Sequence, residues 1–192
     1  MKIILASASP RRSELLRQIG LDFQVQVSRA EESFTAVRAG EVVEQLSARK
    51  AEAVLAGLEE PGEVLVIGAD TVVALEDRIL GKPDSLAGAE EMLRALSGRT
   101  HQVYTGVTLL HRGAGTVERK TFHEMTKVTF FPMTDKEIAE YAAGGECMDK
   151  AGAYGIQGMG ARYIQEIQGD YNNVVGLPVG RLYQEIKEWI ES

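Results

Sequence analysis

Two adjacent arginines follow a Ser-Pro pair near the start of the chain, in the stretch LASASPRRSELL. Ser9 is a favourable N-cap for a helix that begins at Pro10, which places Arg11 and Arg12 in its first turn. The first N–H groups of a helix lack internal partners, and the helix dipole adds about half a positive charge there. Two guanidinium groups at that end favour a bound anion, so the stretch predicts a phosphate site. A solvated helix start is the alternative.

A single aspartate follows the most apolar run of the chain. Asp70 stands in the stretch GADTVV, directly after EVLVIGA. Ligands of open α/β sheets gather outside the carboxyl ends of strands, which is where we expect this carboxylate to lie. On this ground three roles stay open for Asp70: metal ligand, general base, or cap of the next turn.

Further charged residues complete a set suited to one kind of chemistry. Lys50 lies on a predicted helix, Lys82 lies in the loop LGKP, and Glu31 and Glu32 add carboxylates. Cations hold a polyphosphate, while carboxylates bind a divalent ion or take a proton from water, so this set favours cleavage of a phosphate anhydride. Oxygen ligands without a Cys/His cluster favour Mg²⁺ or Mn²⁺ over zinc.

Composition and missing motifs exclude several classes of protein. The net charge of -7 disfavours a nucleic-acid partner. No apolar run approaches the roughly 18 residues of a membrane span, and no signal peptide precedes the first strand, so we expect a cytoplasmic protein. A P-loop, a dinucleotide-binding glycine motif and a serine-hydrolase elbow are all absent from the sequence. We expect Cys147 to be a structural thiol and His101, His111 and His123 to lie at the surface.

The elements that position these residues alternate between strand and helix in the first half of the chain. This alternation, followed by a hairpin, predicts one α/β domain over residues 1–192 with a mixed sheet. We expect the strand of EVLVIGAD to end at Asp70 and a second strand, TVVALEDRIL, to turn at Glu76-Asp77. Glycine is dense in GGECMDKAGAYGIQGMG, which is typical of backbone that bends sharply or approaches a ligand closely. The other predicted strands are KIILAS, DFQVQVS, 102–111, 117–131 and RYIQEIQG. The predicted helices begin near residues 10, 39, 135 and 178, and a further helix follows the loop at the start of GKPDSLAGAEEMLRALSG and stops at Gly98.

Six stretches together resemble a known family. LASASPRRSELL, GADTVV, GKP, LSGRTHQVYTGV, DKAGAYGIQG and GDYNNVVGLP are similar to successive motifs of the Maf family of nucleoside triphosphate pyrophosphatases, in the family's order. They extend from Leu5 to Pro178, so the resemblance covers nearly the whole chain. In the acidic stretch AEES, register with the family's motif selects Glu32 rather than Glu31.

The resemblance implies hydrolysis between the α and β phosphates of a nucleoside triphosphate, with Mg²⁺ or Mn²⁺ as cofactor. It also implies a long, mixed, twisted sheet flanked by helices, two lobes around a cleft as in inosine triphosphate pyrophosphatases, and a homodimer. Carried over by motif, Asp70 would be the proton acceptor and, with Glu32, a metal ligand. The implied polar residues around the substrate are Ser7, Arg11, Arg12, Lys50 and Lys82.

Three positions distinguish branches of that family. Arg11, Thr71 and Gln157 are similar to the branch of dTTP/UTP pyrophosphatases, whereas the branch selective for 7-methyl-GTP has tryptophan in place of the first arginine. The amide of Gln157 offers a donor and an acceptor, which complement a pyrimidine edge with a carbonyl beside an N–H. We therefore expect hydrolysis of dTTP and UTP, with modified pyrimidine nucleotides as further candidates and no nucleic-acid or membrane partner.

Two other functions stay open on the sequence. The first is a nucleotide-sensing regulator of cell division or septum formation, in which turnover is incidental. The second is phosphoryl transfer to an acceptor other than water. The set of Asp70, Glu32 and Lys82 favours hydrolysis over the sensor, because a protein that only binds nucleotide has no need of a general base.

Overall fold

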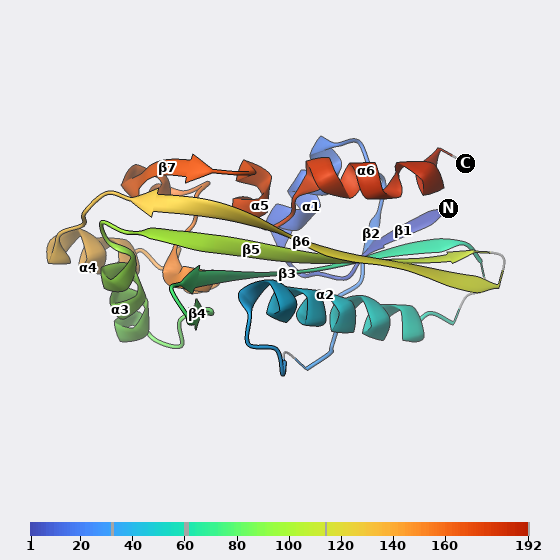
Figure 1. Cartoon of the computed structure of the whole chain (residues 1–192), viewed down its shortest axis with the longest axis horizontal. Helices are drawn as coiled ribbons and strands as arrows, with labels where there is room; N and C mark the ends of the chain where they lie inside the picture. Colours follow the sequence, from blue (N-terminus) through green and yellow to red (C-terminus); the bar gives the residue numbers. More distant parts are fainter. Residues whose placement is uncertain (32, 60–61, 114, 192) are drawn as a thin grey trace. The chain divides into compact units, whose positions relative to one another are not determined.

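A computed structural model of the chain describes residues 1–31, 33–59, 62–113 and 115–191 (Figure 1). Glu32, one of the two predicted metal ligands, lies outside these residues. The strands are β1 (Lys2–Leu5), β2 (Gln24–Val25), β3 (Val64–Leu75), β4 (Arg78–Leu80), β5 (Thr100–Gly113), β6 (Thr116–Phe130) and β7 (Ile164–Gln168). The helices are α1 (Pro10–Gln18), α2 (Ala39–Ala56), α3 (Leu86–Leu96), α4 (Asp135–Ala143), α5 (Tyr171–Val175) and α6 (Val179–Ile190), with short 3₁₀ helices η1 (Ala151–Ala153) and η2 (Met159–Tyr163).

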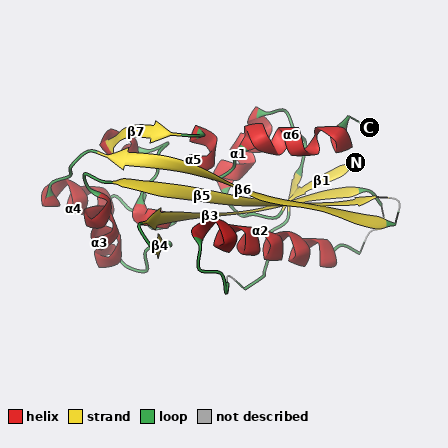
Figure 2. Ribbon diagram, viewed as in Figure 1, coloured by secondary structure: helices red, strands yellow, loops and turns green. Residues whose placement is uncertain are grey.

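The strands form one mixed sheet (Figure 2). The seven-stranded sheet has the order β2-β1-β3-β5-β6-β7, and β4 pairs with β3 beside this path. Strand β1 pairs in parallel with β2 and β3, whereas the β3–β4 and β6–β7 pairs are antiparallel. The predicted α/β class and mixed sheet are confirmed. Among the described residues no helix has both the length and the apolar character needed to cross a membrane.

The chain divides into two compact units. Unit 1 consists of Met1–Asp70, Thr105–Glu124 and Gly176–Ser192, and unit 2 consists of Thr71–Tyr104 and Met125–Val175. Each unit has an apolar core of its own. The cleft that the family resemblance predicts stays a prediction.

In unit 1, helices cover both faces of the sheet. Helix α2 lies on one face, and α1 and α6 lie on the other (Figure 1). The core under α2 joins Ala51 and Val54 of the helix to Ile4, Val66 and Leu110 of three strands. Because successive side chains of a strand point to opposite faces, the strands of unit 1 are apolar throughout where both faces are covered.

In unit 2, helices α3 and α4 pack together over the sheet. Leu93 and Leu96 of α3 and Ile138 of α4 are fully buried in one cluster with Phe130 of β6. Helix α4 begins with a capping box: the hydroxyl of Thr134 accepts from the backbone of the third helical residue, whose carboxylate accepts in return. The predicted start of this helix is confirmed.

Two strand predictions were wrong. The strand that was expected to end at Asp70 continues to Leu75, because Val72 and Val73 are buried and extend the same apolar run. Asp70 therefore lies inside β3, not beyond its end. The predicted strand DFQVQVS is reduced to two exposed residues, 24 and 25, because β2 is an edge strand that pairs only with β1 in the described sheet.

Two of the three histidines are buried, so their predicted surface position was wrong. His101 lies edge-on between the rings of Phe130 and Tyr154, and its Nε2 is 2.8 Å from the hydroxyl of Tyr154. His111 stacks on Trp189, with ring centroids 5.0 Å apart. Both lie on β5, where aromatic neighbours replace water around the imidazole. Burial lowers the pKa of His101 to about 4.

The buried imidazole makes unit 2 sensitive to acid. The unfolded chain binds a proton at His101 near the ordinary pKa of about 6.5, whereas the folded chain does so only near the lowered value. The difference between the two pKa values stabilises the folded state above about pH 6.5. This stabilisation is lost as the pH falls from about 6.5 to about 4. Between about pH 7 and about pH 4, the unfolding free energy of the wild type should fall by about 3 kcal/mol more than that of His101→Gln. Urea denaturation across this range measures both, and parallel pH profiles would contradict the assignment.

Candidate functional site

Lys50 and Asp70 form an ion pair within unit 1. The Nζ of Lys50, on α2, donates a hydrogen bond to Oδ1 of Asp70, on β3. Their side chains are only 14% and 13% exposed, so the charges interact more strongly than they would in open solvent. A carboxylate held in this way is suited to accept a proton from water or to bind a divalent ion. Sequence reasoning named both residues, and the structure brings them together.

Two glycines bring the backbone of α2 close to the sheet and so define where this pair forms. A Cβ on Gly68 of β3 would collide with the carbonyl oxygen of Ser47, and one on Gly106 of β5 would collide with that of Val43. The strands therefore pass directly against the helix backbone at these points. Asp70 lies two residues after Gly68 on β3, and Lys50 lies three residues after Ser47 on α2. The close contact between Gly68 and Ser47 therefore determines the distance between the two charged groups.

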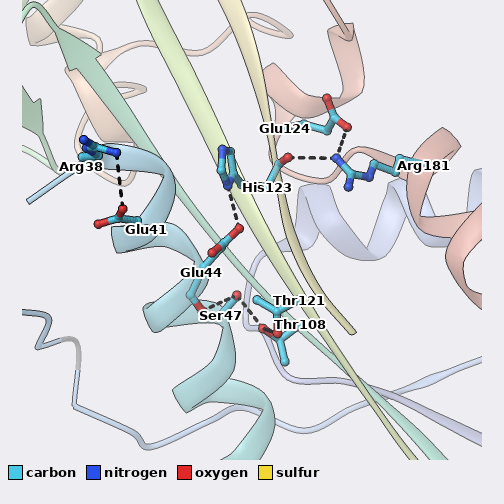
Figure 3. Close-up of polar contacts among 9 residues, drawn as sticks. All are labelled: Arg38, Glu41, Glu44, Ser47, Thr108, Thr121, His123, Glu124 and Arg181. Atoms are coloured by element: carbon cyan, nitrogen blue, oxygen red, sulfur yellow. Dashed lines mark hydrogen bonds and ion pairs between the residues drawn. The ribbon is translucent and has the colours of Figure 1, made fainter. Parts of the chain in front are cut away.

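A chain of buried hydroxyl groups fixes α2 on the sheet (Figure 3). Ser47 Oγ lies 2.9 Å from Thr108 Oγ1, which lies 3.1 Å from Thr121 Oγ1. One turn earlier on α2, Glu44 Oε1 is 2.7 Å from Nδ1 of His123. Ser47 and Thr108 are fully buried, and each has a second partner, because Ser47 Oγ also donates to the carbonyl of Glu44 at 3.0 Å and Thr108 also bonds Thr121. These contacts hold α2 against both β5 and β6.

Arg12 is held by the protein on two sides. Its Nε donates to the carbonyl of Gly176 at 2.8 Å and its Nη1 to Ser7 Oγ at 3.0 Å. Ser7 Oγ also accepts from the N–H of Ser9 at 3.2 Å, so one serine orders both the arginine and the start of α1. Ser9 is the N-cap residue, as predicted, although its side chain makes no capping bond. Arg11 is half-buried on the same turn, and the phosphate-binding role of this turn stays a prediction.

Substituting Arg12 tests how much this anchoring contributes to stability. Lysine has no planar fork and cannot replace both hydrogen bonds, so Arg12→Lys should lower the free energy of unfolding by about 1–3 kcal/mol. Arg17→Lys, on the exposed side of the same helix, is the matched control and should stay within about 0.5 kcal/mol of the wild type. Urea denaturation measures both variants. Equal stability of the two would mean that the buried contacts of Arg12 do not support the fold.

The remaining predicted site residues belong to unit 2. Thr71 is half-buried on β3, Lys82 is exposed in the loop after β4, and Gln157 is exposed in the glycine-dense loop 155–160. Each lies on a different element, and their contacts with substrate stay predictions. Cys147 is fully buried in the core of unit 2, which agrees with a structural thiol.

Helix η1 connects two of these elements. The N–H of Gly152 donates to the carbonyl of Gly81, beside Lys82, at 3.0 Å. A Cβ on Gly152 would lie 2.8 Å from the side chain of Val73 on β3. Gly152 and Ala153 both have positive φ, 70° and 60°, and the second is strained for a residue with a side chain. The motif DKAGAYG thus bends sharply to reach both β3 and the GKP loop.

Sequence reasoning missed Glu146 and Tyr141, which bind the loop that carries Gln157. Glu146 Oε2 accepts from the N–H of Met159 at 2.9 Å, and its Oε1 accepts from the hydroxyl of Tyr141 at 3.0 Å. The available signal was a carboxylate inside a glycine-rich segment, since such a group needs donors when it is partly buried. Among the residues that the structure describes, no three His, Cys, Asp or Glu side chains are grouped to hold a metal ion.

Comparisons with known proteins show which family the chain resembles. A family model described as "Maf-like protein" matches residues 2–189. A "dTTP/UTP pyrophosphatase" of Agathobacter rectalis is 52% identical and covers 97% of both chains. A second protein of that name, from Bacillus thuringiensis subsp. konkukian, is 49% identical over 98% of this chain and 95% of its own. Among solved structures, a HAM1 protein from Coxiella burnetii aligns over 100% of both chains with a TM-score of 0.51 and 17% identity, which supports the fold alone.

Proposed function

The chain belongs to the Maf family, and from that premise we propose that it hydrolyses dTTP and UTP to the monophosphate and pyrophosphate. The observation that carries this proposal is the buried ion pair of Lys50 and Asp70, which places a carboxylate beside a cation on the face of β3 that α2 covers. The full-length relatives named as dTTP/UTP pyrophosphatases support the choice of substrate. The residues at the three branch-specific positions, Arg11, Thr71 and Gln157, support it as well.

In the proposed mechanism, Asp70 takes a proton from the water that attacks the α-phosphorus. Lys50 orients this carboxylate and contributes positive charge next to the developing negative charge on phosphate. Arg12, whose position Ser7 and Gly176 fix, binds phosphate oxygens together with Arg11. Because these cations are positioned before substrate arrives, little reorganisation is needed when pyrophosphate leaves.

A divalent cation is part of the proposal. Mg²⁺ and Mn²⁺ prefer oxygen ligands, and Mg²⁺ typically takes one or two carboxylates and completes its shell with water and substrate phosphates. We propose that Asp70, with Glu32, holds the ion. When bound, it would offset the charge of the triphosphate. In unit 2, Lys82 is proposed as a further phosphate ligand and Gln157 as the residue that binds the pyrimidine edge.

The alternative, a nucleotide-sensing regulator of cell division, is not favoured, because relatives at about half identity are named as pyrophosphatases. A homodimer, which the family resemblance implies, and a cytoplasmic location are further proposals, and sedimentation velocity tests the first. Phosphoryl transfer to another acceptor would differ from hydrolysis in the mass of its product.

A nucleotide panel with Mg²⁺ and with Mn²⁺ tests the function directly. We expect pyrophosphate and monophosphate from dTTP and UTP, and much slower release from CTP and from purine triphosphates. Tight binding of these nucleotides with negligible pyrophosphate release would support the sensor instead. Orthophosphate as product would mean that a different anhydride bond is cleaved.

Arg11→Trp tests the specificity assigned to the first turn of α1. Tryptophan removes a guanidinium and adds a large ring, so preference for dTTP over 7-methyl-GTP should fall by about tenfold or more. The half-buried position of Arg11 allows this change with little effect on folding. The ratio of kcat/KM for the two nucleotides measures it. An unchanged ratio in a folded variant would remove Arg11 from the set of specificity residues.

A further inference from the structure

We propose that Glu146 and Tyr141 are positioning residues for nucleobase selection, because together they hold the loop 155–160 that carries Gln157. This inference rests on the proposed function, since it depends on Gln157 contacting the base. Neither residue needs to touch the nucleotide. Their role is to fix the backbone from which the amide of Gln157 extends.

The hydrogen bonds bracket Gln157 symmetrically along the chain. Two residues before it, the N–H of Gly155 donates to the hydroxyl of Tyr141 at 3.1 Å. Two residues after it, the N–H of Met159 donates to Glu146 Oε2 at 2.9 Å. The hydroxyl of Tyr141 donates in turn to Glu146 Oε1 at 3.0 Å, so both anchors belong to one bonded pair. The direction of each bond is fixed, because a backbone N–H can only donate.

The glycines of this loop accommodate the side chains that hold it. A Cβ on Gly158 would collide with both carboxylate oxygens of Glu146, and one on Gly160 would lie 2.8 Å from the hydroxyl of Tyr141. A Cβ on Gly155 would lie 2.7 Å from Cε of Lys150. The glycine density here was expected to reflect backbone that bends sharply or approaches a ligand closely. At these three positions the missing Cβ leaves room for side chains of residues 141–150, and the loop backbone packs against those side chains.

Charge and burial agree with this role. Although desolvation alone would raise the pKa of Glu146, hydrogen bonds from Met159, Tyr141 and Gly160 hold it below its usual value, so the carboxylate accepts at both oxygens. Burial raises the pKa of Tyr141, which keeps its hydroxyl a donor. Gln157 is exposed, so the direction of its side chain depends on the backbone beneath it. Displacing that backbone would move the amide of Gln157 away from the base edge that it is proposed to bind.

Tyr141→Phe and Glu146→Gln test this inference. The first removes one hydroxyl and keeps a buried ring; the second keeps the shape of the side chain but leaves a single acceptor oxygen. Tyr163→Phe is the matched control, because Tyr163 is equally buried, packs edge-on against Tyr141 and makes the same chemical change. Amide hydrogen exchange at Gly155 and Met159 reports the loop, and kcat/KM for dTTP against CTP reports base selection.

We expect amide exchange to accelerate in both test variants and the preference for dTTP over CTP to fall by about tenfold, with kcat for dTTP within about threefold of the wild type. The control should match the wild type in both measurements. Faster exchange with unchanged preference would overturn the inference, and so would unchanged exchange. A wild-type protein without pyrimidine preference would overturn the proposed function as well, which the panel on the wild type shows before any variant is made.

Discussion

Asp70→Asn is expected to lower kcat for pyrophosphate release by about 10²- to 10⁴-fold while the protein stays folded. The amide has nearly the same shape as the carboxylate but cannot take the proton from water, and it is a poor ligand for a divalent ion. Lys50 would then face a neutral oxygen in place of a charged one. Steady-state release of pyrophosphate from dTTP, with Mg²⁺ or Mn²⁺ present, measures the loss.

Asp22→Asn provides the control for this experiment. Asp22 is exposed in the loop after α1, so the same chemical change there should leave turnover near the wild-type value. Far-UV circular dichroism and urea denaturation show whether each variant folds. A folded Asp70→Asn protein with near wild-type kcat would disprove the proposed role of the carboxylate.

Gly68→Ala should cause a large loss of stability, because the new Cβ meets backbone and not the end of a flexible side chain. It would collide with the carbonyl oxygen of Ser47 and lie 2.9 Å from the backbone nitrogen of Ala51. Helix α2 must then move away from β3, at a cost of about 3 kcal/mol or more. Since α2 carries Lys50, activity should fall with stability.

Gly180→Ala is the matched control for this substitution. No atom lies within 4 Å of a Cβ at Gly180, and the residue is in the first turn of α6, where alanine is the better helix former. Its midpoint of urea denaturation should equal or slightly exceed that of the wild type. A Gly68→Ala protein with wild-type midpoint and wild-type kcat would show that the close packing of α2 does not determine the geometry of the ion pair.

Local signals allowed most elements to be predicted. Helix α1 follows from Ser9 and Pro10 at its start and from Gly20, with φ of 76°, just beyond its end. Helix α4 follows from its capping box. The predicted turn at Glu76-Asp77 is confirmed, because β3 ends at Leu75 and β4 begins at Arg78. The continuity of β3 through Asp70 was missed, although no Gly or Pro interrupts the strand between Asp70 and residue 76. Which strand is an edge depends on pairing between distant segments, so the short β2 was also missed.

The candidate site was predictable as a set of residue types but not as a set of contacts. Lys50 and Asp70 were recognised as a cation and a carboxylate, yet their pairing depends on two glycines that allow α2 to approach the sheet. Glu146 carried no motif that residue types alone would identify. The positioning role proposed for Glu146 rests on the packing of the loop around Gln157 against its carboxylate, which only the structure shows.

The bond between Arg12 and Gly176 joins residues 164 positions apart in the chain. During translation the first helix leaves the ribosome long before its carbonyl partner is made, and domains generally fold as units. A nascent chain that has not reached residue 176 therefore lacks one of the two contacts that order this guanidinium. The capacity to capture a triphosphate would mature late in synthesis, so truncated chains and early translation products should not draw on the nucleotide pool.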